Sequence, residues 1–189
     1  MDNSCLASIH DAAQTSGQIG FRVSPGQNAE FDNLKVTPTA SWPAFVPHDK
    51  MKVWATTEHI GDYLGYTFEA NNVIDDRPET CWSAEWSPLA DLPQSITIDL
   101  GAKRRLCGLA CQPSLDDFRM GYITNYRVLL SEDGKRFTGV AEGFWPATSS
   151  VKLASWPSEQ ARYVRLEALK TSGGEPKIGE LNFTTTPFN

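Results

Sequence analysis

The stretch that decides the fold is Asn72-Val73-Ile74-Asp75-Asp76-Arg77-Pro78-Glu79-Thr80-Cys81-Trp82. Asp75 offers a carboxylate, and Thr80, five positions later, offers a hydroxyl. The Arg77-Pro78 pair between them favours an extended or turning backbone, which exposes carbonyl oxygens. Trp82 begins the next strand and can anchor the turn in a core.

Two interpretations of this turn stay open on its residues alone. Asp and Pro are common turn formers, so an ordinary turn beside a buried tryptophan explains the spacing. Calcium, however, takes about six to eight oxygen ligands, which loop carbonyls and a few side chains can supply. The carboxylate, hydroxyl and carbonyls of this turn are therefore also a candidate cation loop.

Short strands separated by turns follow this stretch. Residues 96–100 alternate apolar and polar side chains, which predicts a half-buried strand that ends at Gly101. Residues 106–111 are apolar on both faces and predict a central strand. Residues 125–130 lead into Ser131-Glu132-Asp133-Gly134, a strong hairpin signal.

Two later segments continue the strand pattern. Val164, Leu166 and Ala168 fall on one face of an alternating segment, and Leu181 and Phe183 point inward on the last one. Helical periodicity is almost absent after residue 52. Strands at this spacing predict an all-β fold, a β-sandwich of the jelly-roll type.

Composition excludes several classes of protein. With 189 residues, 40% hydrophobic and 21% charged, the chain fits one ordinary soluble domain, or one domain and a fragment. A net charge of −6 argues against a nucleic-acid partner, since phosphate binding needs clustered Lys and Arg. No apolar run approaches about 18 residues, so no membrane span is predicted. No secretory signal peptide opens the chain, and we expect the chain to begin inside a larger protein.

Four cysteines are few for a disulfide scaffold: Cys5, Cys81, Cys107 and Cys111. On one strand, Cys107 and Cys111 would lie about 13 Å apart. A disulfide needs Cα atoms about 4.4–6.8 Å apart, so these two cannot bridge each other. Cys-x-x-Cys spacing is absent, which argues against zinc. We expect mainly buried free thiols.

Residues 1–40 do not make a complete domain. Residues 18–23 and 29–36 have strand patterns, with a turn at residues 24–28 between them. Two strands alone are marginal in water, so they should pack on the following domain, a symmetry partner or an upstream domain. We therefore divide the chain into this strand pair with its linker, residues 1–40, and a main domain, residues 41–189.

Five segments, in this order, resemble a coagulation-factor 5/8 type C (discoidin) domain, whose bacterial members are family 32 carbohydrate-binding modules. The segments are the turn with Asp75, Thr80 and Trp82, followed by residues 96–101, 131–134, 161–166 and 178–181. The resemblance covers roughly residues 50 to 185. Residues 1–40 resemble the last hairpin of a concanavalin-like sandwich.

The resemblance implies a structural Ca²⁺ that fixes the turn rather than doing chemistry. The implied ligands are the side chains of Asp75, Thr80 and Glu180 and the carbonyls of Asn72 and Arg77. One departure from the family pattern is Asp76, where the family usually has Gly. A Cβ there strains the turn if φ is positive, although Asp tolerates this better than most residues.

The resemblance also implies a sugar site in the loops, but not its specificity. Galactose-binding relatives carry a His, an Arg and an Asn where this chain has Ser83, Ser114 and Met120, so galactose specificity cannot be carried over. The loops still offer aromatic rings, carboxylates and a guanidinium that suit a sugar. The predicted ligand-binding residues are Glu58, His59, Tyr63, Trp86, Asp117, Phe118, Arg119 and Trp145. Whether the two Trp side chains are exposed or cover the core is left open.

Catalysis has little support in the sequence. None of His10, His48 and His59 stands in a local nucleophile motif, and no phosphate loop or dinucleotide fingerprint is present. Adjacent carboxylates such as Asp75 and Asp76 are more often solvated turn residues than a glycosidase pair. Together with the resemblance, this predicts a non-catalytic module that holds a secreted, multimodular carbohydrate-active enzyme at a glycan. The alternative is a structural or protein-interaction module that binds no sugar.

Overall fold

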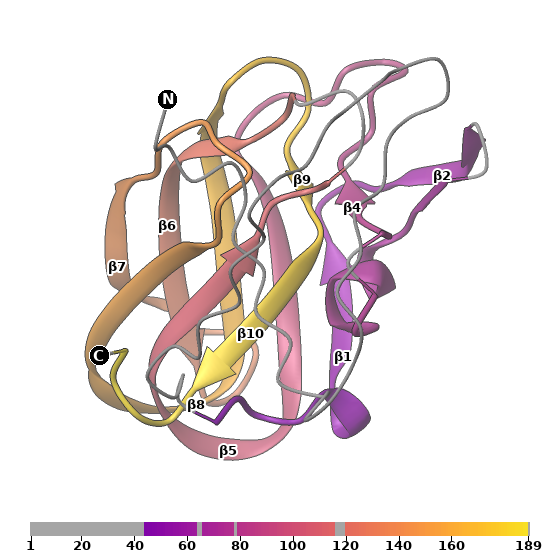
Figure 1. Cartoon of the computed structure of the whole chain (residues 1–189). Coiled ribbons are helices and arrows are strands. Elements are labelled where there is room, and N and C mark those ends of the chain that lie inside the picture. The colour runs from indigo at the N-terminus through magenta and orange to yellow at the C-terminus, as the bar shows by residue number, and fades with distance from the viewer. Residues whose placement is uncertain (1–43, 64–65, 78, 116–119, 189) are drawn as a thin grey trace, which may run out of the picture.

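The computed structural model describes residues 44–63, 66–77, 79–115 and 120–188 (Figure 1). The predicted strand pair in residues 1–40 lies outside these ranges, so the division of the chain at residue 41 stays a prediction. Within the described ranges, no helix is long and apolar enough to cross a membrane.

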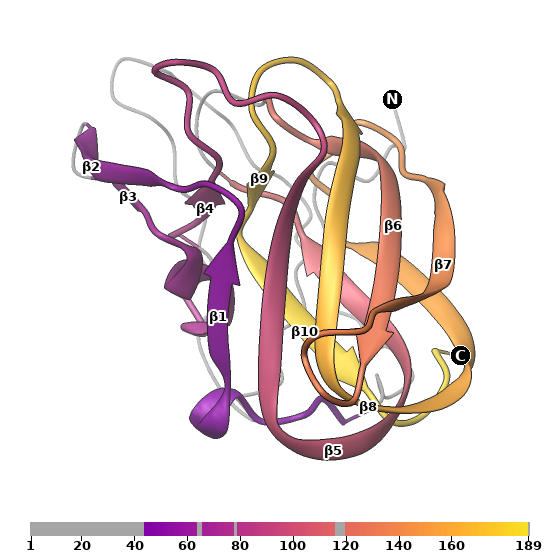
Figure 2. The same ribbon diagram turned by 180° about the vertical axis from the view of Figure 1, so that it is seen from behind.

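The described chain is all-β, as predicted, with two short 3₁₀ helices. The elements are η1 (His48–Lys50), β1 (Lys52–Ala55), β2 (His59–Tyr63), β3 (Tyr66–Phe68), η2 (Ala70–Ile74), β4 (Trp82–Ser83), β5 (Gln94–Gln112), β6 (Ile123–Ser131), β7 (Thr138–Phe144), β8 (Lys152–Thr171), β9 (Lys177–Ile178) and β10 (Glu180–Thr184). The main antiparallel sheet has the order β1-β5-β8-β6-β7, and β10 also pairs with β5. β2 pairs with β3, and β4 pairs with β9 (Figures 1 and 2).

β5 and β8 are long strands that contribute to both layers of the sandwich. The start of β5 pairs with β1 and with the end of β8, whereas its end pairs with β10 and with the start of β8. Both ribbons curve round at the same end of the molecule (Figures 1 and 2). The prediction that the first strand ends at Gly101 is therefore wrong. The chain bends there with a φ of 75° and continues, and the register with β8 shifts between Asp99 and Arg104.

The core fills the space between the layers. The residues predicted to face inward on β8 and β10 are buried, which confirms that pattern: Val164, Leu166, Ala168, Leu181 and Phe183. Residues 106–111 are buried on both faces and pair with β8 along one edge and with β10 along the other, as expected of a central strand.

The prediction of a half-buried strand at residues 96–100 is wrong, because its polar face is also covered. Arg165 donates from Nε to Thr97 Oγ1 at 3.1 Å. Arg162 donates to both carboxylate oxygens of Asp99 at 2.8 Å each. These long side chains on β8 lie over the outer face of β5 and remove its polar residues from water.

The predicted hairpin connects β6 to β7. Asp133 Oδ1 accepts backbone N–H bonds from Arg136 at 2.9 Å and Lys135 at 2.8 Å, which lower the pKa of the Asp133 carboxyl to about 2. Gly134 has a φ of 73° and lies against the ring of Tyr163 on β8. A side chain at this glycine would meet the ring and would need an unfavourable backbone conformation.

Three of the four cysteines lie in the described ranges. All three, Cys81, Cys107 and Cys111, are buried and form no disulfide among the described residues, in agreement with the prediction of mainly buried thiols. Burial raises the pKa of Cys111 to about 12, so this thiol is not reactive at neutral pH.

Candidate ligand-binding and cation sites

The turn after η2 gathers three of the predicted cation ligands. Asp75 accepts a bond from the backbone N–H of Arg77 at 2.9 Å through Oδ1. Thr80 Oγ1 lies 2.8 Å from Asp75 Oδ2 and 2.8 Å from the carbonyl oxygen of Arg77. Asp76 has a positive φ of 58°, which is the condition under which a Cβ at this position strains the turn. We call Asp75, Asp76, Arg77 and Thr80 the cation loop.

Asn72 supports this loop from η2. Its side-chain amide donates to the carbonyl oxygens of Thr67 and Cys81, each at 2.9 Å. These two bonds link the chain before η2 to the chain after the loop. The predicted role of the Asn72 carbonyl as a cation ligand stays a prediction.

Glu180, at the start of β10, faces the cation loop. Its side chain is 11% exposed, and neither carboxylate oxygen accepts a hydrogen bond of good geometry in the described part of the chain. Burial, and then the neighbouring carboxylates of Asp75 and Asp76, raise the pKa of Glu180 to about 8, although the nearby backbone N–H groups of Asp76 and Arg77 act in the opposite direction. A buried carboxylate without well-formed hydrogen bonds is costly, and a cation would remove that cost.

His48 lies beside Glu180, a neighbour that the sequence analysis did not predict. Its Nδ1 is 3.0 Å from Asp76 Oδ1 and 3.4 Å from Glu180 Oε1. The three ligand atoms lie within 4.8 Å of one another. His48 precedes β1 and is 133 positions from Leu181, whose carbonyl its other ring nitrogen contacts, so no local pattern could predict this neighbourhood.

A second cluster joins β2, β3 and the loop after β4. The rings of His59 and Trp86 are stacked, with centroids 3.5 Å apart and an interplanar angle of 18°. Phe68 meets Trp86 edge-on at 4.9 Å and is itself buried. We call His59, Phe68 and Trp86 the aromatic platform. His59 and Trp86, both predicted ligand-binding residues, are thus brought together.

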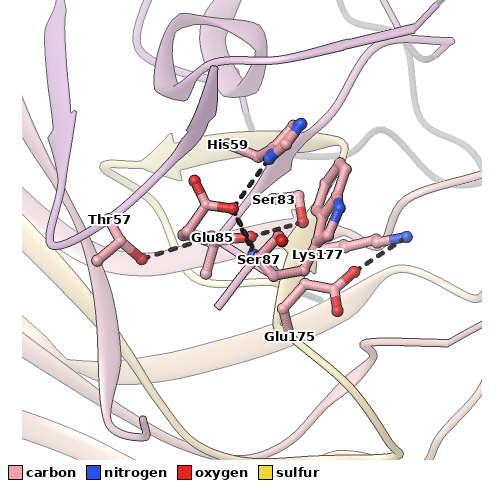
Figure 3. Close-up of polar contacts among 9 residues, drawn as sticks. Thr57, His59, Ser83, Glu85, Ser87, Glu175 and Lys177 are labelled. Carbon is pink, nitrogen blue, oxygen red and sulfur yellow. Dashed lines mark hydrogen bonds and ion pairs between the residues drawn. The ribbon is translucent and has the colours of Figure 1, made fainter. Parts of the chain in front are cut away.

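Glu85 adds a carboxylate to the aromatic platform (Figure 3). Its Oε1 lies 3.0 Å from His59 Nδ1 and accepts backbone N–H bonds from Trp86 and Ser87, each at 2.9 Å. The contact with His59 and the backbone N–H groups lower the pKa of Glu85, so the group is a carboxylate at neutral pH. Sequence reasoning missed Glu85, because only the fold brings it to His59.

β4 and β9 place a buried ion pair next to this segment (Figure 3). Ser83 pairs with Lys177 across the two strands, and Lys177 Nζ lies 3.4 Å from Glu175 Oε1.

The three positions at which galactose-binding relatives carry polar sugar contacts differ in solvent exposure in this chain. Ser83 and Ser114 are buried, whereas Met120 is exposed. The first two side chains are therefore withdrawn from a surface ligand.

The remaining predicted ligand-binding residues fall into two groups. Glu58 Oε2 accepts the backbone N–H of Ala70 at 2.6 Å and so fixes the start of η2. Trp145 is only 4% exposed, stacks on Tyr126 and donates from Nε1 to the carbonyl of Leu153. Its ring is part of the core and has no face for a sugar. The second group, the side chain of Tyr63 with Asp117, Phe118 and Arg119, lies outside the described residues.

Residues 52–181 match the model of the F5/8 type C domain. The chain belongs to the F5/8 type C domain family. A galactose oxidase from Gibberella zeae is 30% identical over 187 residues, which are 94% of this chain and 26% of that protein. A sialidase from Micromonospora viridifaciens is 33% identical over 111 residues, or 56% of this chain and 16% of that protein. This F5/8 type C chain thus spans about a quarter or less of the length of these relatives.

Solved structures similar to this F5/8 type C chain include family 32 carbohydrate-binding modules. One is CpGH89CBM32-5 from Clostridium perfringens, solved in complex with GalNAc-β-1,3-galactose: TM-score 0.70, 34% identity, 75% of this chain and 99% of that one. Another is the family 32 module of NanJ from C. perfringens, solved in complex with galactose: TM-score 0.66, 29% identity, 74% of this chain and 96% of that one. These neighbours are isolated, non-catalytic modules, and the resemblance predicted from the sequence is confirmed.

Proposed function

We propose that this chain is a non-catalytic carbohydrate-binding module that holds a secreted, multimodular carbohydrate-active enzyme at a glycan. Such a module raises the effective concentration of the enzyme at its substrate without taking part in the reaction. The observation that carries the proposal is the aromatic platform beside the Glu85 carboxylate, in a domain whose solved neighbours are sugar-binding modules.

The platform and Glu85 supply the two kinds of contact that a sugar needs. The half-buried ring of Trp86 is held in place by His59 and Phe68, so little of its freedom is lost when a sugar ring stacks on it. Every contact of Glu85 described above uses Oε1, which leaves Oε2 to accept a sugar hydroxyl. Because Ser83 and Ser114 are buried in place of the galactose contacts, we expect a glycan other than simple galactose.

Affinity electrophoresis and a glycan array test this proposal with two matched tryptophans. Trp86→Ala should lower affinity about 30-fold, because truncating an aromatic anchor costs about 2 kcal/mol or more. Trp54→Ala is the control: Trp54 is 45% exposed on the outer face of β1 and touches Tyr163, away from the platform. Glu85→Gln keeps the stack and should lower affinity without moving the thermal midpoint greatly. Equal affinity in the Trp86 and Trp54 variants would refute the platform as the site.

Two other functions remain as outcomes of the same measurements. If no glycan on the array retains the wild-type chain, the domain is a structural or protein-interaction module. If the chain alone releases the chromophore of a chromogenic glycoside, it is an enzyme. Neither outcome would affect the assignment to the family.

We also propose that the cation loop and Glu180 hold a divalent cation in a structural role, with Ca²⁺ as the ion that the family resemblance implies. The buried carboxyl group of Glu180, whose oxygens accept no hydrogen bond of good geometry among the described residues, and the oxygens of Asp75, Thr80 and Arg77 fit this role. The ion would fix the loop and would take no part in chemistry. Thermal melts with and without a chelator test this, and an unchanged midpoint in Asp75→Ala would count against it.

A further inference from the structure

The last strand of the domain carries a sequence motif that belongs neither to the cation loop nor to the aromatic platform. Asn182-Phe183-Thr184, in β10, is the only Asn-x-Ser/Thr triplet of the chain. In proteins that enter a eukaryotic secretory pathway, this triplet is the acceptor for an N-linked glycan. Because so short a motif also arises by chance, its place in the fold decides whether a glycan fits there.

The fold turns the side chain of Asn182 away from the core. Leu181 and Phe183, its two neighbours in β10, are both buried in the core. Successive side chains of a strand point to opposite faces of the sheet, so Asn182 lies on the outer face. Its side chain is partly exposed and makes no hydrogen bond within the described ranges. The amide nitrogen that would carry a sugar is therefore not engaged elsewhere in this part of the chain.

The outer face has room for a sugar beside Asn182. Asn182 pairs with Ala110 on β5, which in turn pairs with Leu153 on β8. Ala110 presents only a methyl group, and Leu153 is 40% exposed, so this row of side chains is not covered. The neighbouring row is covered, since a Cβ added to Gly108 would lie 2.6 Å from the ring of Phe188. A glycan on Asn182 would extend over the open row.

Thr184 limits the time at which a glycan can be attached. The motif needs the hydroxyl of its third residue as well as the asparagine. In the folded chain Thr184 is completely buried, and its Oγ1 donates to the carbonyl oxygen of Thr186 at 2.6 Å. β10 is the last described strand and pairs with β5, so it finds its place only after nearly the whole domain has been synthesised. The triplet is thus open in the nascent chain and closed in the folded one.

We infer that Asn182 is the acceptor of an N-linked glycan, which is attached before β10 docks, as the chain enters a eukaryotic secretory pathway. Nδ2 of Asn182 attacks C1 of the first sugar of an oligosaccharide carried on a lipid pyrophosphate. The new C–N bond forms, the bond from C1 to the pyrophosphate oxygen breaks, the lipid pyrophosphate leaves and the amide loses one proton. This inference uses the secreted location in the proposed function, but not its sugar-binding site.

The glycan would lie away from the aromatic platform. In Figure 1, β10 belongs to the layer nearest the viewer, whereas the β2–β3 pair, which carries His59 and Phe68, projects from the side of the sandwich. A glycan on the outer face of β10 leaves the platform open. We therefore expect chains with and without the N-linked glycan to bind a glycan array equally well.

Secretion of the full chain from eukaryotic cells, behind a signal peptide, tests the inference. Intact-mass spectrometry should show an added oligosaccharide that peptide:N-glycosidase removes, and peptide mapping should then find Asp in place of Asn182. The glycan should be absent from Asn182→Gln and from Thr184→Ala, which keeps the asparagine but breaks the motif. Asn125→Gln is the matched control: Asn125 is also a partly exposed strand asparagine, but it begins no such triplet. This variant should keep the full glycan mass.

A second measurement tests the order of attachment and folding. A purified oligosaccharyltransferase with its lipid-linked donor should modify a synthetic peptide of residues 178–188 but not the folded, unglycosylated chain. Secreted wild-type chain without a glycan, or with a glycan at another residue, would overturn the inference. Equal modification of the peptide and the folded chain would overturn its account of Thr184. A chain that lacks the glycan but binds the array leaves the proposed function intact, and a glycosylated chain that binds no sugar does the reverse.

Discussion

Replacing Glu180 by Gln should change stability in opposite directions with and without metal. In chelator, the wild type keeps a buried carboxyl group that accepts no hydrogen bond of good geometry among the described residues, close to the carboxylates of Asp75 and Asp76. A buried acceptor without a partner costs about 1–3 kcal/mol. With a pKa of about 8, the Glu180 carboxyl is largely protonated in the folded state at pH 7, so folding in chelator includes the unfavourable uptake of a proton. Gln needs no proton and offers an N–H₂ donor to the neighbouring acids, so Glu180→Gln should be about 1–2 kcal/mol more stable than the wild type.

In saturating metal, the wild type should instead be more stable than Glu180→Gln. A ligand at about 100 times its dissociation constant stabilises the native state by about 2.7 kcal/mol. For a domain of this size that is a rise of about 5–10 °C in the thermal midpoint. Glu180→Gln lacks one metal ligand, so metal should raise its stability much less than it raises that of the wild type.

Urea unfolding and thermal melts at pH 7, in excess chelator and in excess calcium, measure both differences. Glu175→Gln is the matched control, since Glu175 is also a buried carboxylate but faces the Lys177 ammonium at 3.4 Å. That variant should be destabilised by a similar amount in both conditions. If Glu180→Gln is less stable than the wild type in chelator, the carboxylate makes a stabilising interaction, and the argument for a cation fails.

Two further perturbations test how the sandwich is held together. Asp99→Asn should cost about 1–2 kcal/mol at pH 7 by breaking the paired bonds from Arg162. Arg162 holds the pKa of Asp99 below its usual value, so this stabilisation exists above about pH 3.8 and is lost as the pH falls through the folded-state value. Urea unfolding from pH 7 to pH 3 should show the difference shrinking, and a constant difference would contradict the ion-pair origin. Gly134→Ala should cost about 1 kcal/mol or more, because its φ is 73° and a Cβ would meet the Tyr163 ring at 3.1–3.2 Å. Gly139→Ala, with no atom within 4 Å of the added Cβ, should be nearly neutral, and equal losses would refute the steric argument.

The fold could be predicted from the sequence where the pattern is local. Alternation identifies the inward residues of β8 and β10, and the Ser131–Gly134 turn identifies the β6–β7 hairpin. The bend of β5 at Gly101 could not be predicted, because a glycine after an alternating run can either end a strand or mark a bend within one. Only the pairing of β5 with both halves of β8 decides that the strand continues.

The sites were less predictable, because their residues meet through the tertiary structure. Trp86 and Trp145 were both predicted to lie in ligand-binding loops. Trp86 lies on the aromatic platform, whereas Trp145 stacks on Tyr126 in the core. Sequence spacing carries no information on this choice. Glu85 and His48 were missed for the same reason: the partners of each come from other segments of the chain.

The cation site and the aromatic platform are connected through η2, and this connection has a measurable consequence. The first N–H of η2 is bound by Glu58, the neighbour of His59 on the platform, and the end of η2 leads directly into Asp75. Trp82, just after the cation loop, donates from Nε1 to the Thr57 carbonyl at 3.0 Å and so ties the same β1–β2 segment from the other side. An ion that orders the loop therefore also restrains the segment that positions His59. We expect chelation to weaken glycan binding well below the unfolding temperature, although no metal ligand touches the sugar. Unchanged glycan affinity in chelator, measured on a chain whose thermal midpoint has fallen, would show that the two sites are independent.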